Sequence, residues 1–339
     1  MTLQTFFKRF VPPLEQEMMD VVQVTGEHYA PFIGMLHYHL GWVDDAFQPC
    51  QAHGGKRIRP VVCLLTCQAC GGDWRQALPA GAAIELLHNF SLIHDDIEDD
   101  DRIRRGRATV WAIWGEAQGI NTGDAMLAMA QLAGLRLAKR GVAPETTVAA
   151  LELLNRTCIS LTSGQFLDIG FEQRDDVSVD EYLSMIEGKT AALVSCSCEM
   201  GALVAGGTAG QQEILHRFGR HMGLGFQMRD DILGIWGDPE VTGKAAGADI
   251  QRRKKSLPIL LGLERSEELR ALFEKDSLSE ADVEEAKAIL TETGCLEDVE
   301  NRERVHYDQA VAALDELDVE GGAVDALREL AEKLLHRNY

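Results

Sequence analysis

Apolar residues recur at helical spacing along nearly the whole chain. In residues 74–98 they return every three or four positions, which is the period of an amphipathic helix. The part of the chain after about residue 265 carries acidic amphipathic patterns of the same period, and no segment shows the alternation expected of a strand. Further long helices are predicted over residues 123–140, 148–172, 179–206 and 211–237. The pattern therefore predicts an all-α chain.

Glycine, proline and short polar stretches separate these segments, without a low-complexity linker or a repeat of fixed period. The chain has 339 residues, a length compatible with one large domain or two smaller ones. Because 45% of the residues are hydrophobic, a substantial core can form. We expect residues 1–339 to form a single domain, a large helical bundle.

The formal net charge is −21, from 33 lysines and arginines against 54 aspartates and glutamates. Nucleic-acid binding rests on a surplus of Lys and Arg, so the composition argues against nucleic acid as a partner. No apolar run reaches the length of a membrane span, and the first residues do not resemble a signal peptide. We expect a cytoplasmic protein without a transmembrane segment.

Several of the eight cysteines fall in apolar helical segments. Cys63, Cys67 and Cys70 are spaced to share one helix face, and Cys196 and Cys198 lie in another apolar stretch. The CxxC formed by Cys67 and Cys70 suggests zinc or redox chemistry, but neither a second CxxC nor paired histidines follow. We therefore predict that these cysteines are buried as small apolar side chains.

Two acidic motifs lie in apolar helical segments. In the stretch SLIHDDIEDDDRIRRG, Asp95 and Asp99 are four positions apart and share a helix face, with Asp96 adjacent. Asp230 and Asp231 form a second pair in FQMRDDILGIWGD. Either motif alone is compatible with a solvated helix terminus. If the two face each other, their repulsion requires cations, and Mg²⁺ suits such a site because it combines one or two carboxylates with water and phosphate oxygens.

Cations cluster beside glycines at three places in this acidic chain. Arginine binds phosphate oxygens through two parallel hydrogen bonds, and lysine acts as a point charge. The clusters are Lys56, Arg57 and Arg59 in GGKRIRP, Arg102, Arg104, Arg105 and Arg107 in RIRRGR, and Lys244, Arg252, Arg253, Lys254 and Lys255 in GKAAGADIQRRKKSLP. Pairing with surface acids would explain the charge balance but not the glycines, so the clusters predict a site for an anionic small molecule.

Three other site types are disfavoured. EGKTA resembles the end of a P-loop, but Leu183 stands where the first glycine is required, and no strand precedes it. The first acidic motif lacks the glycine and the spacing of a calcium-binding EF-hand loop. His88 and His94 are six positions apart on one helix, which does not suit a zinc pair. We expect each of them to hydrogen-bond to a phosphate or to the core.

The motifs occur in the order and approximate spacing of a known family. From GGKRIRP through ELLHNFSLIHDDIEDDDRIRRGRATVW, NTGDAML, GKTAAL and FQMRDDILGIWGD to TGKAAGADIQRRKKSLPIL, residues 54–260 resemble the trans-type (E) isoprenyl diphosphate synthases, or polyprenyl synthetases. The resemblance implies one all-α domain of long helices around a central cavity, usually in a homodimer. It also implies a prenyltransferase that condenses isopentenyl diphosphate with an allylic prenyl diphosphate, using three Mg²⁺ ions.

The resemblance also assigns roles to individual residues. The Mg²⁺ ligands correspond to Asp95, Asp96 and Asp99 in the first motif and to Asp230 and Asp231 in the second. The isopentenyl diphosphate site corresponds to Lys56, Arg59, His88 and Arg105, and the allylic diphosphate site to Arg104, Lys189, Lys244 and Lys254. The polar groups that steady the allylic cation correspond to Thr190 and Gln227.

The reaction implied by the resemblance needs no side-chain base. Metal ions and cationic side chains neutralise the allylic diphosphate, which leaves to give a carbocation in an apolar cavity. The alkene of isopentenyl diphosphate attacks this cation head-to-tail, and the released diphosphate takes the proton. One position departs from the family: Gly234 stands where the second motif usually has a third aspartate. We expect activity to survive, because the first two aspartates usually lie closest to the metal.

Product length is expected to depend on the helix that carries the first motif. Phe90, Ser91 and Leu87 lie shortly before Asp95. In the family, an aromatic residue five positions before the first aspartate accompanies a short product. The resemblance therefore predicts geranylgeranyl diphosphate, with farnesyl diphosphate second and longer chains third. The alternative is that Phe90 is ordinary core packing.

Two other functions remain open on the sequence alone. A class I terpene cyclase ionises the same substrate without isopentenyl diphosphate, but it does not need GGKRIRP and usually has an Asn/Ser/Glu metal motif that is not seen here. A non-catalytic subunit of a heteromeric synthase tends to lose the aspartates, whereas this chain keeps five of them. Growth of an allylic primer by five-carbon units would identify the synthase.

Overall fold

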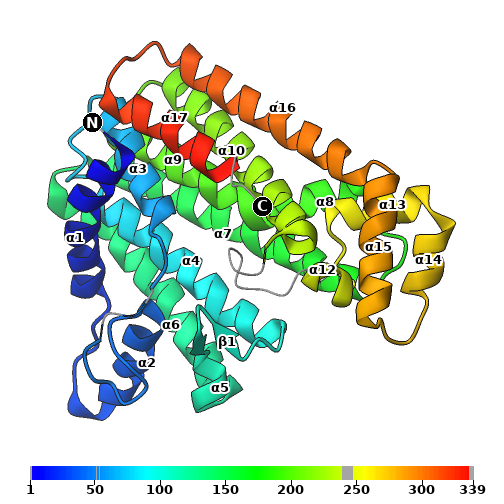
Figure 1. The fold of residues 1–339 in the computed structure, drawn as a ribbon. Coiled ribbons are helices and arrows are strands. Elements are labelled where there is room, and N and C mark those ends of the chain that lie inside the picture. The colour runs from blue at the N-terminus through cyan, green and yellow to red at the C-terminus, as the bar shows by residue number, and fades with distance from the viewer. Residues whose placement is uncertain (1, 51, 53, 239–246, 336–339) are drawn as a thin grey trace. The chain divides into compact units, whose positions relative to one another are not determined.

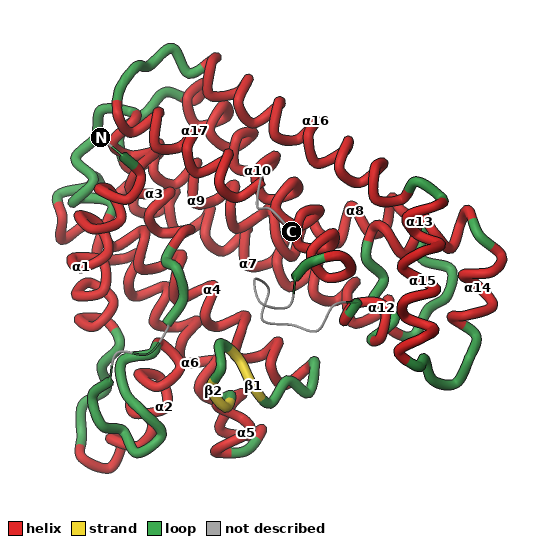
Figure 2. The backbone as a smooth tube through the Cα atoms, viewed as in Figure 1, coloured by secondary structure: helices red, strands yellow, loops and turns green. Residues whose placement is uncertain are grey.

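The computed structural model describes residues 2–50, 52, 54–238 and 247–335. Helices make up most of the described chain and strands almost none of it, which confirms the all-α prediction (Figure 1 and Figure 2). No described helix combines the length and the apolar character needed to cross a membrane.

A small hairpin interrupts the helices directly after the first acidic motif. β1 (Ile103–Arg104) pairs antiparallel with β2 (Arg107–Ala108). Arg105 (φ 53°) and Gly106 (φ 75°) both have left-handed backbone in the two-residue turn, which is the conformation that closes tight hairpins. Two residues per strand are too few to show an alternating pattern, which is why the sequence gives no sign of this hairpin.

The chain folds into two compact units, and the expectation of a single domain over residues 1–339 stays a prediction. The first unit contains Met1–Cys158, Cys196–Leu215 and Val319–Leu327. Elements that lie wholly in it, besides the hairpin, are α1 (Leu3–Val21), η1 (Glu27–Tyr29), α2 (Ala30–Leu40), α3 (Ile58–Ala69), α4 (Leu78–Glu98), α5 (Val110–Trp114), α6 (Glu116–Leu135) and η2 (Arg136–Arg140). Parts of α7 (Pro144–Glu172), α9 (Ala192–Val204), α10 (Ala209–Trp236) and α17 (Gly322–Leu335) also belong to it.

Helix α4 is the centre of the first unit. It is buried along most of its length and packs against α1, α3 and α6. Glycines on α6 permit this approach, because a β-carbon at Gly119 would lie 2.8 Å from Ile97 Cδ1. The helix starts at Leu78, later than the predicted residue 74, with Pro79 in its first turn. It ends at the C-cap residue Asp99, so the first acidic motif occupies its last turn.

The cysteine prediction is confirmed for four of the five residues that it names. Cys63, Cys67, Cys196 and Cys198 are buried in the first unit, whereas Cys70 is only partly buried. Burial raises the pKa of the Cys67 thiol to about 12, which keeps it protonated and unreactive. None of the eight cysteines forms a disulfide.

The second unit contains Ile159–Ser195, His216–Asp318 and Arg328–Tyr339. Its core is formed by apolar residues such as Tyr182, Ile232, Ile235 and Ile250, all at most 1% exposed. Elements that lie wholly in it are α8 (Val179–Ile186), η3 (Glu187–Ala191), α12 (Ala248–Gln251), α13 (Leu257–Arg265), α14 (Glu267–Phe273), α15 (Glu280–Glu292) and α16 (Cys295–Glu316).

Candidate functional site

The first acidic motif is paired with an arginine from the hairpin that follows it. Asp96 is 1% exposed and accepts a hydrogen bond from Arg104 Nε at 2.5 Å, while Arg104 Nη2 lies 3.3 Å from Asp95 Oδ2. Burial raises the pKa of Asp96 to about 6, and the guanidinium of Arg104 opposes that rise. Asp99 is exposed at the end of α4. Arg104 therefore brings Asp95 and Asp96 together and holds their negative charge.

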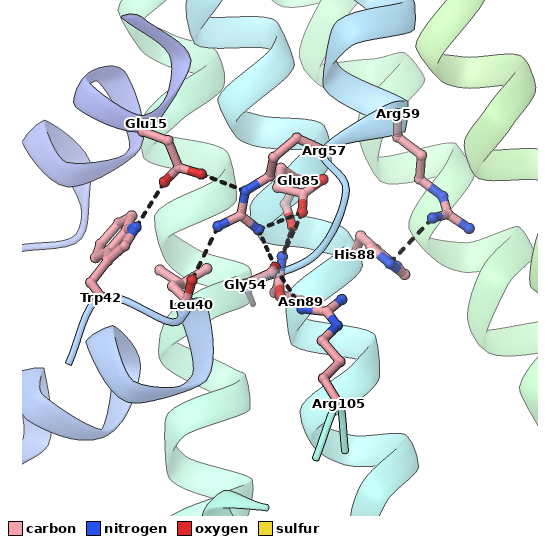
Figure 3. Close-up of polar contacts among 10 residues, drawn as sticks. All are labelled: Glu15, Leu40, Trp42, Gly54, Arg57, Arg59, Glu85, His88, Asn89 and Arg105. Atoms are coloured by element: carbon pink, nitrogen blue, oxygen red, sulfur yellow. Dashed lines mark hydrogen bonds and ion pairs between the residues drawn. The ribbon is translucent and has the colours of Figure 1, made fainter. Parts of the chain in front are cut away.

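The glycine-rich loop carries a buried arginine that organises it (Figure 3). Arg57 is 4% exposed and donates to Glu15 Oε1 at 2.7 Å, to Glu85 Oε1 at 2.8 Å and to the carbonyl of Gly54 at 2.6 Å. It also donates to the carbonyl of Leu40 at 3.1 Å. Because Arg57 donates to these four acceptors, it holds the loop in place. The other cations of the loop motif, Lys56 and Arg59, are better placed than Arg57 to bind an anionic ligand.

The second hairpin arginine lies against the same loop. Arg105 Nη1 donates to the carbonyl of Gly54 at 2.5 Å. Gly55 has left-handed backbone (φ 107°), and a β-carbon there would lie 2.9 Å from Arg105 Nη2. A β-carbon at Gly54 would lie 2.1 Å from the carbonyl oxygen of Leu40, and the left-handed backbone of Gly55 strains any other residue, so both positions favour glycine.

Arg59 and His88 lie next to each other beside this loop (Figure 3). Arg59 Nη1 donates to His88 Nε2 at 3.2 Å, so the imidazole accepts through that nitrogen. Burial lowers the pKa of His88 well below its usual value, and the positive charge of Arg59 adds to the effect. The Nε of Arg59 is buried without a hydrogen-bond partner among the described residues. Lys56, from the same loop, is exposed.

His39 at the end of α2 is a further polar residue that sequence reasoning missed. Burial lowers its pKa to about 3, with smaller contributions from Arg105 and Arg104. Its Nε2 is buried without a hydrogen-bond partner in the described chain. No motif marks this histidine, because it reaches the cations only through the packing of α2.

In the second unit, Lys189 and Thr190 lie in η3, a π-helical turn between α8 and α9. π-Helical turns are rare in proteins, and those that occur are often found at functional sites. A β-carbon at Gly164 of α7 would lie 2.2 Å from the backbone nitrogen of Lys189, so η3 contacts the α7 backbone directly. Lys189 Nζ pairs with Asp168 Oδ2 at 2.5 Å. The sequence indicated Lys189 but gave no signal for Asp168 or for the π-helical turn.

A chain of hydrogen bonds joins Thr190 to the second acidic motif. Thr190 Oγ1 donates to Gln227 Oε1 at 2.8 Å, and Gln227 Nε2 donates to Asp231 Oδ1 at 3.1 Å. Asp231 is 1% exposed and also accepts from the hydroxyl of Tyr182 and from the backbone N–H of Leu257. The three predicted residues are thus brought together, while Tyr182 carries no sequence signal beyond its apolar surroundings.

The carboxylates of the second motif interact electrostatically with Lys254. Burial raises the pKa of Asp231 to about 6, and Lys254 opposes the rise. Burial tends to lower the pKa of Lys254, but Asp231, Asp249 and Asp230 outweigh it and raise that pKa. Asp230 itself is exposed. Lys244, the remaining predicted phosphate contact, lies outside the described residues.

The two acidic motifs fit a metal that is held only partly by protein. Within the described ranges, no group of three or more His, Cys, Asp or Glu side chains could hold a metal ion alone. Mg²⁺ takes one or two carboxylates and completes its octahedron with water and substrate phosphate, which is the donor set that each motif offers. The predicted meeting of the two motifs, one in each unit, stays a prediction.

The residues predicted to control product length follow one another along α4. Phe90 is 7% exposed, and its ring contacts the His94 ring edge-on with centroids 5.0 Å apart. Leu87 is fully buried, and Ser91 is partly buried with its hydroxyl bonded to the carbonyl of His88 at 2.8 Å. Their role in product length stays a prediction.

Comparison with known proteins identifies the family. The sequence model described as polyprenyl synthetase matches residues 41–290. The chain is 44% identical over 249 residues to a (2E,6E)-farnesyl diphosphate synthase of Mycobacterium tuberculosis, covering 74% of this chain and 66% of the relative, just under two thirds of its length. It is 43% identical over 269 residues to a geranylgeranyl diphosphate synthase of the same species, covering 78% of this chain and 76% of the relative.

A solved structure agrees over the full length. The polyprenyl synthase of Caulobacter crescentus, complexed with calcium and isoprenyl diphosphate, has a TM-score of 0.83 and 29% identity, covering 99% of this chain and 97% of that one. The family match covers well over half of the present chain, and it includes both acidic motifs and the glycine-rich loop. This chain belongs to the polyprenyl synthetase family.

Proposed function

We propose that this protein is a short-chain trans-prenyltransferase. It joins isopentenyl diphosphate to an allylic prenyl diphosphate head-to-tail, and its main product is geranylgeranyl diphosphate. The observation that carries the proposal is the pairing of Arg104 with both Asp95 and Asp96, directly beside a loop that gathers further cations. An anionic substrate held through metal and arginine together requires this combination of charges.

The isopentenyl diphosphate end is supported by the cations of the first unit. Arg59, Arg105 and Lys56 supply positive charge around a loop with glycine backbone, and the neutral His88 adds a polar ring beside Arg59. The unpartnered Arg59 Nε is a buried donor available to a phosphate oxygen. The charge of this group suits a diphosphate.

The allylic end is supported by the polar chain of the second unit. Lys189 supplies a cation, while the oxygen of Thr190 and the carbonyl of Gln227 place partial negative charge where an allylic cation would develop. Asp231 fixes the Gln227 amide by accepting from Nε2, so that Oε1 faces Thr190. These groups orient and stabilise, and none of them acts as a base.

Divalent metal binding belongs to the same proposal. Asp95, Asp96 and Asp99, together with Asp230 and Asp231, would hold Mg²⁺, which supplies the positive charge that makes the allylic diphosphate a good leaving group. Three ions per active site are expected by resemblance. The released diphosphate can take the proton from the condensed product, so the absence of a Ser–His–Asp or Cys–His constellation from the sequence causes no difficulty.

A homodimer is the proposed assembly. In the first unit, α6 exposes large apolar residues that no described element covers: Ile120, Leu132 and Leu135. In the second unit, α7 does the same with Ile159, Phe166 and Ile169, of which Phe166 is 76% exposed. Apolar groups of this kind on helix surfaces mark interaction sites, and a second copy of the chain is the partner that the family resemblance implies.

The activity is tested with the purified full-length chain. Isopentenyl diphosphate, Mg²⁺ and each allylic primer in turn are supplied, and products are identified by mass. Growth by five-carbon units to a twenty-carbon product, abolished by a metal chelator, is the expected result. A hydrocarbon or alcohol formed without isopentenyl diphosphate would identify a cyclase instead, and no conversion of any primer would contradict the proposal.

A further inference from the structure

A pocket of about 290 Å³ lies within the first unit, lined by residues that have no part in the proposed reaction. It is formed by α1, by the turn that leads into α4 and by the end of η2. The residues that determine its chemistry are Pro13, Glu17, Trp74, Arg75, Leu78 and Arg140. Its volume is at the lower end of the range found for ligand sites, so it suits a small molecule.

Ion pairs between α1 and η2 hold one wall of this pocket in place. Glu17 is 1% exposed and accepts from Arg136 Nε at 2.6 Å and also from Arg140. The same Arg136 donates through Nη2 to Asp20 Oδ2 at 3.3 Å. Both carboxylates of this wall are therefore paired with arginines, so they do not repel an anionic ligand as unpaired carboxylates would.

Trp74 contributes a buried hydrogen-bond donor that has no acceptor. The residue is 7% exposed, and its Nε1 has no hydrogen-bond partner among the described residues. A buried indole N–H usually finds a partner, because an unpaired buried donor costs free energy. The indole N–H groups of Trp42, Trp111 and Trp236 each donate to an oxygen. An acceptor oxygen supplied by a ligand would satisfy the N–H of Trp74.

Two arginine side chains lie against the Trp74 ring. The Cζ atoms of Arg9 and Arg75 are 5.1 Å and 4.9 Å from the centre of that ring. Arg75 donates to Asp73 Oδ1 at 3.2 Å, whereas Arg9 makes no hydrogen bond or ion pair within the part of the chain that the structure describes. Both arginines are exposed, so their side chains can turn outward and open the ring to a ligand. An arginine without an ion pair thus adjoins a donor without an acceptor.

We infer that this pocket binds a small carboxylate with an apolar body. The carboxylate accepts from Trp74 Nε1 and pairs with Arg9, since charged hydrogen bonds of this kind are strong. The apolar body lies against Pro13 and Leu78. A single negative charge fits better than a diphosphate, because the other arginines around the pocket already have carboxylate partners. The inference is independent of the proposed function, whose residues lie elsewhere in the sequence.

The test measures binding of para-trifluoromethylbenzoate to the full chain by fluorine NMR of the probe, with Mg²⁺ and inorganic pyrophosphate present to fill the proposed diphosphate sites. We expect saturable binding with a dissociation constant of about 1 mM or lower, as for other ligands of this size. The neutral para-trifluoromethylbenzyl alcohol should bind about tenfold more weakly. Arg9→Gln and Trp74→Phe, which keeps an aromatic ring but removes the N–H, should each weaken binding of the benzoate about fivefold or more. Lys8→Gln is the matched control, because Lys8 is the adjacent exposed cation on α1, and it should leave the affinity unchanged.

Several outcomes would overturn the inference. Unchanged affinity in Arg9→Gln would do so, and because Arg9 is exposed, this variant decides the question even if Trp74→Phe does not fold. Equal losses in Arg9→Gln and Lys8→Gln would reveal a general effect of charge in place of a site. Equal binding of the benzoate and the alcohol would remove the role of the carboxylate. Binding that pyrophosphate abolishes would place the probe in the diphosphate sites. None of these results bears on prenyl transfer, which the assay with allylic primers tests separately.

Discussion

Arg104 Nε lies 2.5 Å from Asp96 Oδ1, which joins the hairpin after α4 to the buried carboxylate in the last turn of that helix. Because Asp96 is 1% exposed, its negative charge depends on this partner. The same guanidinium reaches Asp95 at 3.3 Å, so one arginine fixes both acidic side chains. An ion placed between these carboxylates and a diphosphate would find its ligands already oriented.

Arg104→Ala should therefore impair both stability and substrate use. We expect the loss of a charged hydrogen bond to a buried group to cost about 2 kcal/mol in unfolding free energy, and the KM for the allylic diphosphate to rise at least tenfold. Arg104→Lys should recover only part of this, since lysine cannot make the same pair of contacts. Arg102→Ala is the control, because Arg102 is exposed and its ion pair with the exposed Asp100 is long, at 3.9 Å. Equal effects of Arg102→Ala and Arg104→Ala would contradict the assigned role.

Gly164→Ala tests the contact between α7 and the π-helical turn. Its β-carbon would meet the backbone nitrogen of Lys189 at 2.2 Å, and backbone cannot move aside as a flexible side chain can. We expect a loss of about 2 kcal/mol in stability and at least a tenfold fall in product formation, as Lys189 and Thr190 are displaced. Gly170→Ala on the same helix meets nothing within 4 Å and should be neutral or slightly stabilising. Full activity in Gly164→Ala would show that the position of η3 does not matter.

The histidine pair in the second unit makes stability depend on pH. His221 Nδ1 and His306 Nδ1 lie 3.0 Å apart, and burial, followed by the charge of His221, lowers the pKa of His306 to about 4. In the unfolded chain His306 binds a proton near pH 6.5, whereas in the folded chain it does so only near pH 4. The contribution to stability is therefore fully present above pH 6.5 and decreases as the pH falls from 6.5 to about 4. Allowing for partial exposure, the loss should be about 1–2 kcal/mol.

Chemical denaturation at pH 7 and pH 5 measures this dependence. His306→Gln keeps a polar side chain that does not titrate, so its stability should differ less between the two pH values than that of the unchanged protein. His28→Gln is the control, because His28 is exposed. An identical pH dependence in His306→Gln and the unchanged protein would exclude the pair as its source.

Much of the site could be predicted from the sequence because the chemistry lies in contiguous motifs. Asp95, Asp96 and Arg104 are close in the chain as well as in space, since a single helix turn and a hairpin separate them. Asp249 and Asp168 could not be recognised in this way. Each reaches its partners through the packing of a separate helix, and a single acidic residue in an acidic chain gives no distinguishing pattern.

The same distinction holds for the fold. Helical periodicity gave the long helices, because their apolar faces repeat many times. The hairpin could not be predicted from the sequence pattern, because its strands have only two residues on either side of the turn formed by Arg105 and Gly106. The π-helical turn at Lys189 was not predicted, because one extra residue in a turn leaves the apolar pattern nearly unchanged. Its contact with Gly164 lies in another helix and leaves no local signal.

The exposed apolar face of α7 predicts the effect of a charge placed on it. Phe166→Glu should shift the protein from dimer to monomer in light scattering coupled to size-exclusion chromatography, because a buried interface would have to desolvate the new carboxylate. Val305 on α16 is also exposed, at 52%, so Val305→Glu is the matched control and should leave the mass unchanged. A Phe166→Glu protein that remains dimeric would place the interface elsewhere.

Phe90 is expected to limit product length. Its ring is 7% exposed and contacts His94, one turn before the first acidic motif, where a growing prenyl tail would pass along α4. Phe90→Ala should yield products longer than twenty carbons, whereas Ser91→Phe, which adds bulk at the next position, should shorten them. Loss of a buried aromatic ring also costs about 3–5 kcal/mol in stability. Phe6→Ala on α1 therefore serves as the control, since Phe6 is also buried, at 1% exposure, but lies far from the motif in the sequence. Product masses from the three variants distinguish the two roles of Phe90. If Phe90→Ala gives longer products and Phe6→Ala does not, Phe90 limits the length of the product. If Phe90→Ala leaves product length unchanged, Phe90 serves only in core packing.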